Sequence, residues 1–344
     1  MSQHPTLARR GRAVVSILLP VFNGAATLAA ALRSIRRQTL TTWECIVVDD
    51  GSTDATLACL RSYAAEDPRF VVTETPHRGL VAALNRGLEL CNGRFVARMD
   101  ADDAMHRQRL EAQVGALEAN PSLTGVGCHV RLLPRADLRD GRRAYEAWLN
   151  SMRCAEDVRR DAYVECPVAH PTMMFRREIL AGFGYRDCGW AEDYDLLLRL
   201  LAAGHEVGVV ARRLLAWRDR PERLSRTSPV YGLDRFTACK AAFLAGTFLR
   251  AADQYILWGF GDTGKAIRKA LAAHGKRAAL IVELHPGRIG RQIHGAPVIP
   301  PQELPGNRGL PIVVSVAGAV PRRENRACLT AMDFVELRDF VCVA

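Results

Sequence analysis

The stretch Arg94-Phe-Val-Ala-Arg-Met-Asp-Ala-Asp-Asp103 has the pattern of a short buried strand that ends in three carboxylates. Carboxylates at a strand end can hold a divalent cation. A hard ion such as Mg²⁺ or Mn²⁺ takes one or two carboxylates and completes its shell with phosphate oxygens and water. The stretch therefore points to a diphosphate substrate. Aspartate-rich turns are also common caps, so the triplet alone leaves that alternative open.

The segments around this stretch alternate between apolar runs of strand length and amphipathic helical stretches. That alternation is typical of an α/β domain with a mainly parallel sheet flanked by helices. We expect a first strand at 14–19, stopped by Pro20, and a helix at 25–37. Further strands are expected at 44–50 and 70–73, and further helices from about residue 55 and at 79–90.

Polar side chains follow several of these strands. In open α/β sheets a ligand binds outside the carboxyl ends of the strands, and the turns after Leu19, Val48 and Met99 lie at such ends. We therefore expect the following side chains to converge on one crevice: Asn23, Asp49, Asp50, Asp100 and Asp102.

The length of 344 residues favours two domains, and 49% hydrophobic with 24% charged residues is the composition of a globular protein. No apolar run is long enough to span a bilayer, and the start of the chain lacks the apolar core of a signal peptide. We expect a cytoplasmic protein. The ten cysteines contain no Cys-x-x-Cys pair, which suggests neither a zinc site nor a disulfide framework.

The net charge of +10 favours acidic partners such as nucleotide diphosphates or anionic lipid. A peripheral contact with the inner face of a membrane, through residues 131–143, is one expectation. An arginine-rich composition without a partner is the alternative. No nucleic-acid partner is expected, because the basic residues form no block with interleaved aromatics.

Five motifs in order make residues 14–225 resemble a family 2 glycosyltransferase with the nucleotide-sugar-binding GT-A fold. They are Leu19-Pro-Val-Phe-Asn-Gly24, Val47-Val-Asp-Asp-Gly-Ser-Thr-Asp54, Gly79-Leu-Val-Ala-Ala-Leu-Asn-Arg-Gly87, Met99-Asp-Ala-Asp-Asp103 and Trp190-Ala-Glu-Asp-Tyr-Asp-Leu196. The resemblance implies an inverting, metal-dependent enzyme of surface polysaccharide biosynthesis. Its donor would be a nucleotide-diphosphate sugar, most often a UDP-sugar, and its acceptor a hydroxyl of a glycan or lipid-linked molecule.

The same resemblance implies roles for the residues of the first, second and fourth motifs. Asp100 and Asp102 bracket the ribose and the Mn²⁺ or Mg²⁺ ion on the diphosphate. Many relatives carry a glutamate shortly after the asparagine of the first motif, where this chain has Gly24-Ala-Ala, which removes one polar contact. The base and ribose are held by Pro20, Phe22 and Asp50, with Asp49 as neighbour.

Breaking a sugar–diphosphate bond builds negative charge on the leaving oxygens, and a bound cation stabilises that charge. The acceptor hydroxyl needs a base, for which a carboxylate is suited. Asp193, in Ala191-Glu-Asp-Tyr-Asp195, matches the family's catalytic base, and a direct displacement predicts inversion at the anomeric carbon. Alternatively, Glu192 and Asp193 only cap a helix at 194–203.

Three further residues are candidates for contacts with the acceptor or the diphosphate: His170, Glu192 and Arg218. In similar enzymes the strand Cys166-Pro-Val-Ala-His-Pro-Thr-Met-Met-Phe-Arg176 lines the acceptor side. A structural histidine and a surface arginine are the alternatives. Asn85 is expected to brace the fold rather than bind.

The last part of the chain carries a second α/β pattern. Strand, glycine loop, helix, strand and acid follow one another, as in dinucleotide-binding units. This unit resembles the small Rossmann-like N-terminal domains of bacterial sugar acyltransferases, including the phrase Gly290-Arg-Gln-Ile-His-Gly-Ala-Pro-Val-Ile299. The resemblance implies a second nucleotide ligand or a scaffold role. Its candidate residues are Gly259, Gly261, Gly264 and Glu283.

The expected division is a basic N-terminal tail at 1–13, a GT-A domain at 14–230, a helical connector at 231–253 and a Rossmann-like accessory domain at 254–344. A non-catalytic nucleotide-sugar sensor or assembly module is the competing function. Asp100, Asp102 and Asp193 together favour the enzyme, because a binder needs no base. A nucleotidyltransferase is disfavoured, since Pro20-Val-Phe-Asn is not a glycine-rich loop that grips a triphosphate.

Overall fold

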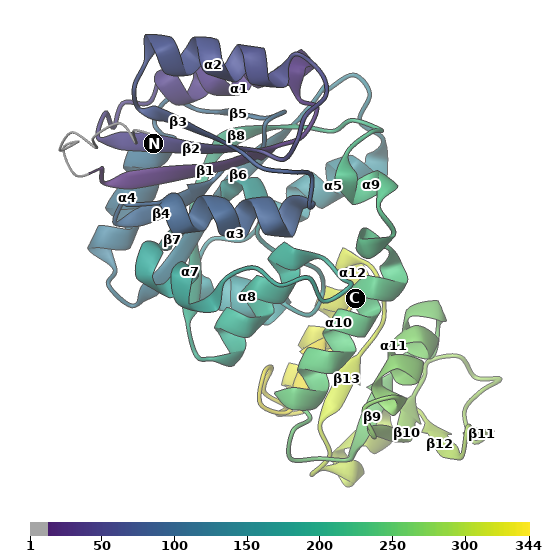
Figure 1. The fold of residues 1–344 in the computed structure, drawn as a ribbon. Coiled ribbons are helices and arrows are strands. Elements are labelled where there is room, and N and C mark those ends of the chain that lie inside the picture. Colours follow the sequence, from purple (N-terminus) through teal and green to yellow (C-terminus); the bar gives the residue numbers. More distant parts are fainter. Residues whose placement is uncertain (1–12) are drawn as a thin grey trace. The chain divides into compact units, whose positions relative to one another are not determined.

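The computed structural model describes residues 13–344, which divide into two compact units (Figure 1). The N-terminal unit contains the chain up to Ala155 together with Val168–Arg186 and His205–Arg220. The C-terminal unit contains Glu156–Pro167, Asp187–Gly204 and Pro221–Ala344. Apart from Ala13, the basic tail lies outside the described residues.

The N-terminal unit is built on an eight-stranded sheet in the order β3-β2-β1-β4-β7-β6-β8-β5. β1 to β4 pair in parallel, whereas β7 is antiparallel to both β4 and β6. This confirms the predicted mixed α/β fold with a mainly parallel sheet. The strands are β1 (Val15–Val21), β2 (Trp43–Asp49), β3 (Phe70–Glu74), β4 (Phe95–Arg98), β5 (Ala104–Met105), β6 (Leu123–Leu133), β7 (Met174–Arg176) and β8 (Glu206–Arg218).

Helices cover both faces of this sheet. α1 packs its buried Leu28, Leu32 and Ile35 into the core formed by one face of β1, while α3 packs on the other face. The helical elements of the unit are α1 (Ala25–Arg36), α2 (Thr56–Glu66), α3 (Leu80–Leu90), α4 (Arg109–Ala119), α5 (Asp140–Leu149), η1 (His170–Thr172) and α7 (Arg177–Phe183).

β1 does not stop at Pro20, as the sequence suggested, but continues to Val21. Pro20 pairs with Val48 of β2, whereas the pairing of β1 with β4 ends at Leu18. Along a parallel strand the backbone groups alternate between the two neighbours, and Leu18 bonds toward the β4 side. The backbone of Pro20 therefore points to the β4 side, where β1 no longer has a partner strand. The missing N–H of Pro20 removes no hydrogen bond between strands.

Gly87 of the third motif lets α3 approach the sheet closely. A Cβ at this position would lie 2.3 Å from Leu18 Cδ1 and 2.9 Å from Val48 Cγ2. The helix and the sheet could not stay at this separation with any larger residue. This glycine therefore serves the packing of α3 on β1 and β2.

The C-terminal unit contains a six-stranded sheet in the order β11-β12-β10-β9-β13-β14. All neighbours pair in parallel except the hairpin β11–β12. The chain order reverses between β9 and β13, which is the switch point of a doubly wound sheet. The strands are β9 (Gln254–Trp258), β10 (Arg277–Val282), β11 (Gln292–Ile293), β12 (Ala296–Ile299), β13 (Ile312–Val314) and β14 (Phe340–Cys342).

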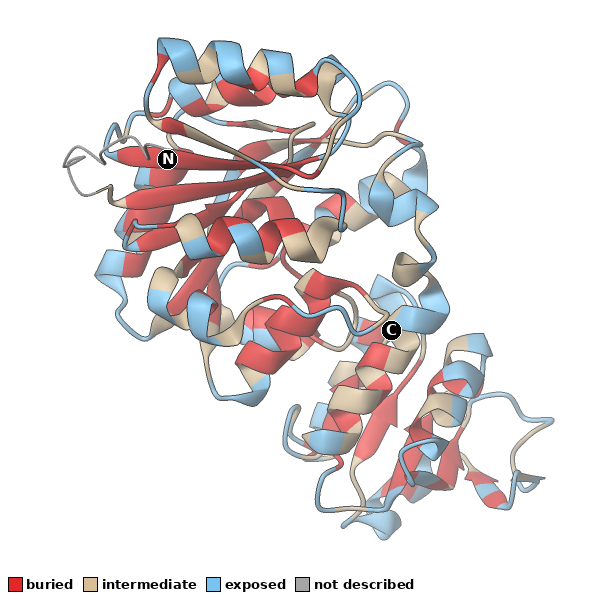
Figure 2. Cartoon of the chain, in the orientation of Figure 1, coloured by how far each residue is buried: buried red, intermediate tan, exposed pale blue. Residues whose placement is uncertain are grey.

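The central strands β9, β10 and β13 of the smaller sheet are mostly buried, as their red colour in Figure 2 shows, whereas β11 at the edge is not. Tyr255 and Leu257 belong to one core, and Ile256 and Trp258 to the other, which is the alternation expected of a central strand. The helical elements of this unit are α6 (Ala155–Asp161), α8 (Glu192–Ala202), α9 (Leu224–Thr227), η2 (Pro229–Tyr231), α10 (Leu233–Gly246), α11 (Asp262–Ala272), η3 (Pro301–Asn307) and α12 (Ala319–Ala331).

The division into units differs from the expected boundary at residue 230, because most of α6 and all of α8 pack with the C-terminal unit. Tyr194 of α8 is fully buried and its ring lies 5.4 Å from that of Phe236 on α10. Lys240 of α10 donates to the carbonyls of Val164 and Val343.

Among the described helices, none combines the length and the apolar character needed to cross a bilayer.

Candidate functional site

The acid triplet after β4 forms a compact cluster. Carboxylate oxygens of Asp100, Asp102 and Asp103 lie within 4.8 Å of one another. Asp103 is fully buried, and its Oδ1 accepts a hydrogen bond of 2.8 Å from the backbone N–H of Arg218 at the end of β8. Asp100 and Asp102 are half-buried. The triplet therefore contains one acid that fixes the backbone and two that stand at the surface.

Two buried arginines, Arg98 and Arg109, lie next to the triplet, and no sequence motif assigned them a role. Arg98 pairs with Asp100 through Nη2 and Oδ1 at 2.7 Å. Arg109 is fully buried and donates from Nη2 to the carbonyl of Arg98 at 2.8 Å. Burial lowers the pKa of Arg109, while Cys128 and Asp103 oppose that effect. Positive charge below the acids reduces their mutual repulsion.

A hard divalent cation fits this donor set, because clustered carboxylate oxygens are the ligands that Mg²⁺ and Mn²⁺ prefer. Asp103 is held by the backbone of Arg218, and Asp100 shares its charge with Arg98. Asp102, with Asp100, is the pair that could hold the ion.

The two acids after β2 organise the neighbouring loops. Asp49 Oδ1 accepts from the N–H and hydroxyl of Ser52. Asp50 Oδ1 accepts from the N–H of Arg78 at 2.9 Å, and its Oδ2 from the N–H of Gly79 at 2.8 Å. Both carboxylates are almost completely buried. Asp50 thus satisfies N–H groups at the start of α3, where Gly79 has a φ of +87°.

Phe22, in the turn after β1, stacks on His77, with ring centroids 4.0 Å apart. His77 also contacts Asp50, with Nδ1 2.9 Å from Oδ2. Phe22 is 46% exposed and the His77 side chain 56% exposed, so the pair presents an aromatic surface to solvent. His77 was not among the predicted residues, although its position two residues before the Gly79 motif could have indicated it.

Asn23 joins the turn after β1 to the turn after β2. Its backbone has a φ of +51°, its N–H donates to Ser52 Oγ at 2.9 Å, and its side-chain Oδ1 accepts from the N–H of Thr53 at 2.8 Å. Pro20 lies inside β1, just before this turn. The structure therefore brings Phe22, Asn23, Asp49 and Asp50 together at the carboxyl ends of β1 and β2.

His170 belongs to a network that includes Asn85 and Tyr185. Asn85 and the backbone of Tyr185 exchange two hydrogen bonds of 2.9 Å, and the Tyr185 hydroxyl lies 3.1 Å from His170 Nε2. This confirms Asn85 as a brace. His170 was expected on a strand but lies in the 3₁₀ turn η1, because Pro171 has the fixed φ that suits a helical first turn.

The acids of the fifth motif lie in the first turn of α8, in the C-terminal unit. Glu192 Oε2 accepts from the Tyr231 hydroxyl at 2.6 Å, and Asp195 pairs with Arg199 at 2.6 Å. Both are buried, whereas Asp193 is half-buried and accepts from the N–H of Tyr194. The helix begins at Glu192, so Ala191, not an acid, holds the N-cap position. Of these three acids, Asp193 is the most accessible.

The glycine loop after β9 is tightly packed. A Cβ at Gly259 would lie 2.6 Å from Val316 Cγ2, and one at Gly264 only 2.2 Å from the Gly259 carbonyl, whereas Gly261 has open space. Glu283 Oε1 accepts from the loop N–H of Phe260 at 2.6 Å and pairs with Arg288. Packing within the unit accounts for Gly259 and Gly264, and Glu283 braces the loop itself. A nucleotide here remains a prediction.

Residues 16–183 match the family model described as glycosyl transferase family 2. The putative glycosyltransferase EpsE of Bacillus subtilis is 30% identical over 236 residues, which cover 66% of this chain and 82% of EpsE. The amylovoran biosynthesis glycosyltransferase AmsE of Erwinia amylovora is 30% identical over 196 residues, which cover 56% of this chain and 71% of AmsE.

Solved structures share the fold. S. aureus TarS in complex with UDP-GlcNAc has a TM-score of 0.55 at 16% identity, over 77% of this chain and 73% of that chain. The mannosyltransferase PcManGT from Pyrobaculum calidifontis, in complex with GDP-Man and Mn²⁺, has a TM-score of 0.50 at 24% identity, over 77% and 69%. At these identities the likeness shows the fold alone.

Proposed function

We propose that this chain, which belongs to glycosyl transferase family 2, is an inverting, metal-dependent enzyme that moves a sugar from a nucleotide-diphosphate sugar to a hydroxyl of a glycan or lipid-linked acceptor. Glycosyl transfer follows from the family. The donor, the metal and the stereochemistry are the proposal. The observation that carries it is the cluster of Asp100, Asp102 and Asp103 at the carboxyl end of β4.

The donor nucleotide is proposed to bind over the turns after β1 and β2. The exposed ring of Phe22, stacked on His77, offers an apolar face for the base. Asp49 and Asp50 hold the surrounding loops in place through their bonds to Ser52, Arg78 and Gly79. UDP is the first candidate, since relatives of this family most often use uridine nucleotides. TarS and PcManGT, whose structures contain UDP-GlcNAc and GDP-Man, show that both base classes occur on this fold.

The diphosphate is proposed to lie at Asp102 and Asp100, which would hold Mn²⁺ or Mg²⁺. A divalent cation bound there would offset the negative charge that grows on the leaving diphosphate. Arg98, paired with Asp100 and almost completely buried, fixes that carboxylate in one orientation. Asp103 does the same for the backbone at Arg218, whose side chain is a proposed diphosphate contact.

Asp193 is proposed as the base that takes the proton of the acceptor hydroxyl. Asp193 is the half-buried carboxylate of this turn, whereas Glu192 and Asp195 are buried and contact Tyr231 and Arg199. The deprotonated oxygen then forms the new bond to the anomeric carbon while the bond to the diphosphate oxygen breaks on the opposite face. The result is inversion at that carbon.

The first test is calorimetric titration of the full chain with UDP, GDP and dTDP, each with and without Mn²⁺. We expect metal-dependent binding of one nucleotide, followed by slow release of the matching sugar in a hydrolysis assay. Binding without any sugar release or transfer, in wild type and in Asp193→Asn alike, would favour the alternative function, a nucleotide-sugar sensor. No binding of any nucleotide would count against both functions.

A further inference from the structure

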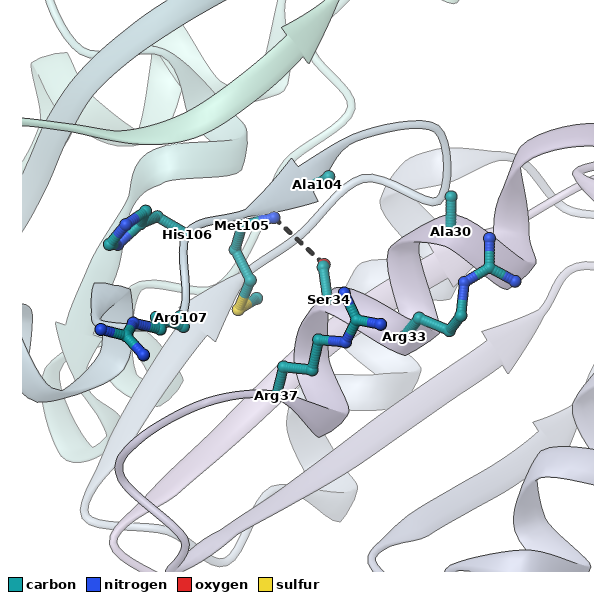
Figure 3. A pocket seen from close by; sticks show the side chains of 8 residues that line it. All are labelled: Ala30, Arg33, Ser34, Arg37, Ala104, Met105, His106 and Arg107. Carbon is teal, nitrogen blue, oxygen red and sulfur yellow. Dashed lines mark hydrogen bonds between the residues drawn. The ribbon is translucent and has the colours of Figure 1, made fainter.

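A basic groove runs along α1 on the N-terminal unit (Figure 3). One bank is formed by α1, with Arg33 and Arg37, and the other by the segment after β5, with His106 and Arg107. The floor between them is apolar and made of small or buried side chains. The groove has a volume of about 680 Å³, within the range of about 300–1,000 Å³ that is usual for ligand clefts. Its floor residues are Ala30, Ala104 and Met105.

The two banks are fixed to each other by hydrogen bonds. The N–H of Met105 donates to Ser34 Oγ at 3.1 Å, drawn as the dashed line in Figure 3. Gln38 Nε2 donates to the carbonyl of His106 at 2.9 Å, and the N–H of Thr39 to the carbonyl of Arg107 at 2.8 Å. These bonds use backbone groups of the second bank and do not involve the Arg107 guanidinium, whereas His106 Nδ1 accepts from the N–H of Gln108. The groove is therefore already formed without a ligand.

The arginines of the groove have no acidic partner among residues 13–344. No carboxylate lines the groove, and none of Arg33, Arg37 and Arg107 forms an ion pair in the described part of the chain. The nearby acids are engaged elsewhere. Glu66 pairs with Arg36 at 2.9 Å, and Glu111 accepts from Thr39 Oγ1 at 2.7 Å. An uncompensated positive groove attracts an anion.

The distribution of the charges indicates the kind of anion. Arg33 and Arg37 lie one turn apart on α1, and the Arg107 side chain extends from the facing bank away from α1, so the three guanidinium groups stand apart instead of meeting at one point (Figure 3). A single phosphate would meet one of them, and a flat bilayer would touch the banks but not the floor. A chain with several anionic groups can meet all three. Guanidinium groups bind carboxylates through paired donors.

We propose that this groove binds an acidic oligosaccharide, with uronate carboxylates on the arginines and the apolar faces of sugar rings on Ala30, Ala104 and Met105. The choice of a glycan rests on the proposed function, since a glycosyltransferase meets its own product or acceptor chain. Ala104, which lines the groove, directly follows the acid triplet in the chain. It holds the polymer as an anchoring surface, separate from the residues assigned to the donor.

The test compares three forms of the full chain by titration with an oligogalacturonate, with a neutral maltodextrin of the same length, and with vesicles of phosphatidylglycerol. The groove variant carries Arg33→Gln, Arg37→Gln and Arg107→Gln. The control variant carries Arg61→Gln, Arg86→Gln and Arg94→Gln, which remove the same charge from exposed arginines that pair with Glu74, Glu89 and Glu118. Thermal unfolding checks that both variants are folded, and Arg107→Gln alone provides a milder change.

We expect wild type to bind the oligogalacturonate and not the maltodextrin, with an affinity that falls as salt rises. The groove variant should bind about tenfold more weakly, the loss expected for three exposed charge pairs, and the control variant less than twofold. Equal losses in the two variants, no binding by wild type, or groove-dependent binding of vesicles alone would each overturn the proposal. Nucleotide titration of the same samples reports on the donor site separately, so failure of the proposed function is distinguishable from failure of the groove.

Discussion

Asp103 Oδ1 accepts a 2.8 Å hydrogen bond from the backbone N–H of Arg218, which ties the loop after β4 to the end of β8. Asp103 is fully buried, whereas Asp102 is half-buried. The adjacent carboxylates of one motif therefore perform different tasks, one holding the backbone and the other facing the proposed diphosphate.

Replacing Asp103 by Ala should therefore reduce stability. The change leaves the N–H of Arg218 without its acceptor, and an unsatisfied buried group costs about 1–3 kcal/mol. Urea denaturation of wild type and variant gives the difference in free energy of unfolding. If the variant unfolded at the wild-type urea midpoint, the bracing role would be wrong.

Replacing Asp102 by Ala should lower the free energy of unfolding less than Asp103→Ala does, because Asp102 is half-buried whereas Asp103 is fully buried. The Mn²⁺-dependent part of nucleotide binding should be lost, because the cation would lose its principal ligand. Calorimetric titration with and without Mn²⁺ measures this. If the variant kept the full Mn²⁺ dependence of nucleotide binding, Asp102 would not be the metal ligand and another acid would have to bind the cation.

The pair Asp193→Asn and Asp195→Asn separates a chemical role from a structural one. Asp193→Asn should keep nucleotide affinity and lose turnover by at least about a hundredfold, the usual contribution of a general base. Asp195 is buried against Arg199 and accepts from Trp190 Nε1, so its loss should lower stability first. The readouts are nucleotide titration, sugar-transfer rate and thermal unfolding. Similar losses of stability in both variants would contradict the role of Asp193 as a base and indicate a structural role instead.

Truncation after residue 230 should give a chain that aggregates. It removes α10, on which α8 packs through Tyr194 and Phe236, and it exposes a fully buried tyrosine ring. Size-exclusion chromatography and nucleotide titration of the truncated chain provide the test. A monomer that binds nucleotide as wild type does would show that the first 230 residues fold independently.

Buried thiols should make the protein less stable at alkaline pH. Burial raises the pKa of Cys91 to about 12 and that of Cys128 to about 11. In the unfolded chain these thiols ionise near pH 8.5, so above that pH the unfolded state binds fewer protons than the folded one, and stability falls as pH rises. Each thiol should lower the free energy of unfolding by about 1 kcal/mol between pH 8.5 and 9.5, because it is already half ionised in the unfolded chain at pH 8.5. Urea midpoints measured across this range should fall less steeply in Cys128→Ala, and a parallel decline in the variant would refute the assignment.

The parts of the fold that the sequence predicted are those with local signals. The apolar runs of β1 to β4 and β9 predicted parallel strands, and the carboxylates that follow some of these strands predicted where a ligand crevice would lie. The end of β1 was mispredicted, because proline normally stops a strand and only the early end of the β4 pairing makes Pro20 acceptable. The burial of Arg98 and Arg109, and the difference between Asp102 and Asp103, depend on segments far away in the sequence that no local pattern reveals.

The interleaving of the two units has a consequence for synthesis in the cell. A ribosome releases the segments in chain order, so α8 emerges well before α10, its packing partner in the same unit. During that interval the Tyr194 ring of α8 lacks Phe236, whose ring lies 5.4 Å away in the folded protein. The helix that carries Asp193 therefore reaches its native packing only after α10 has been synthesised.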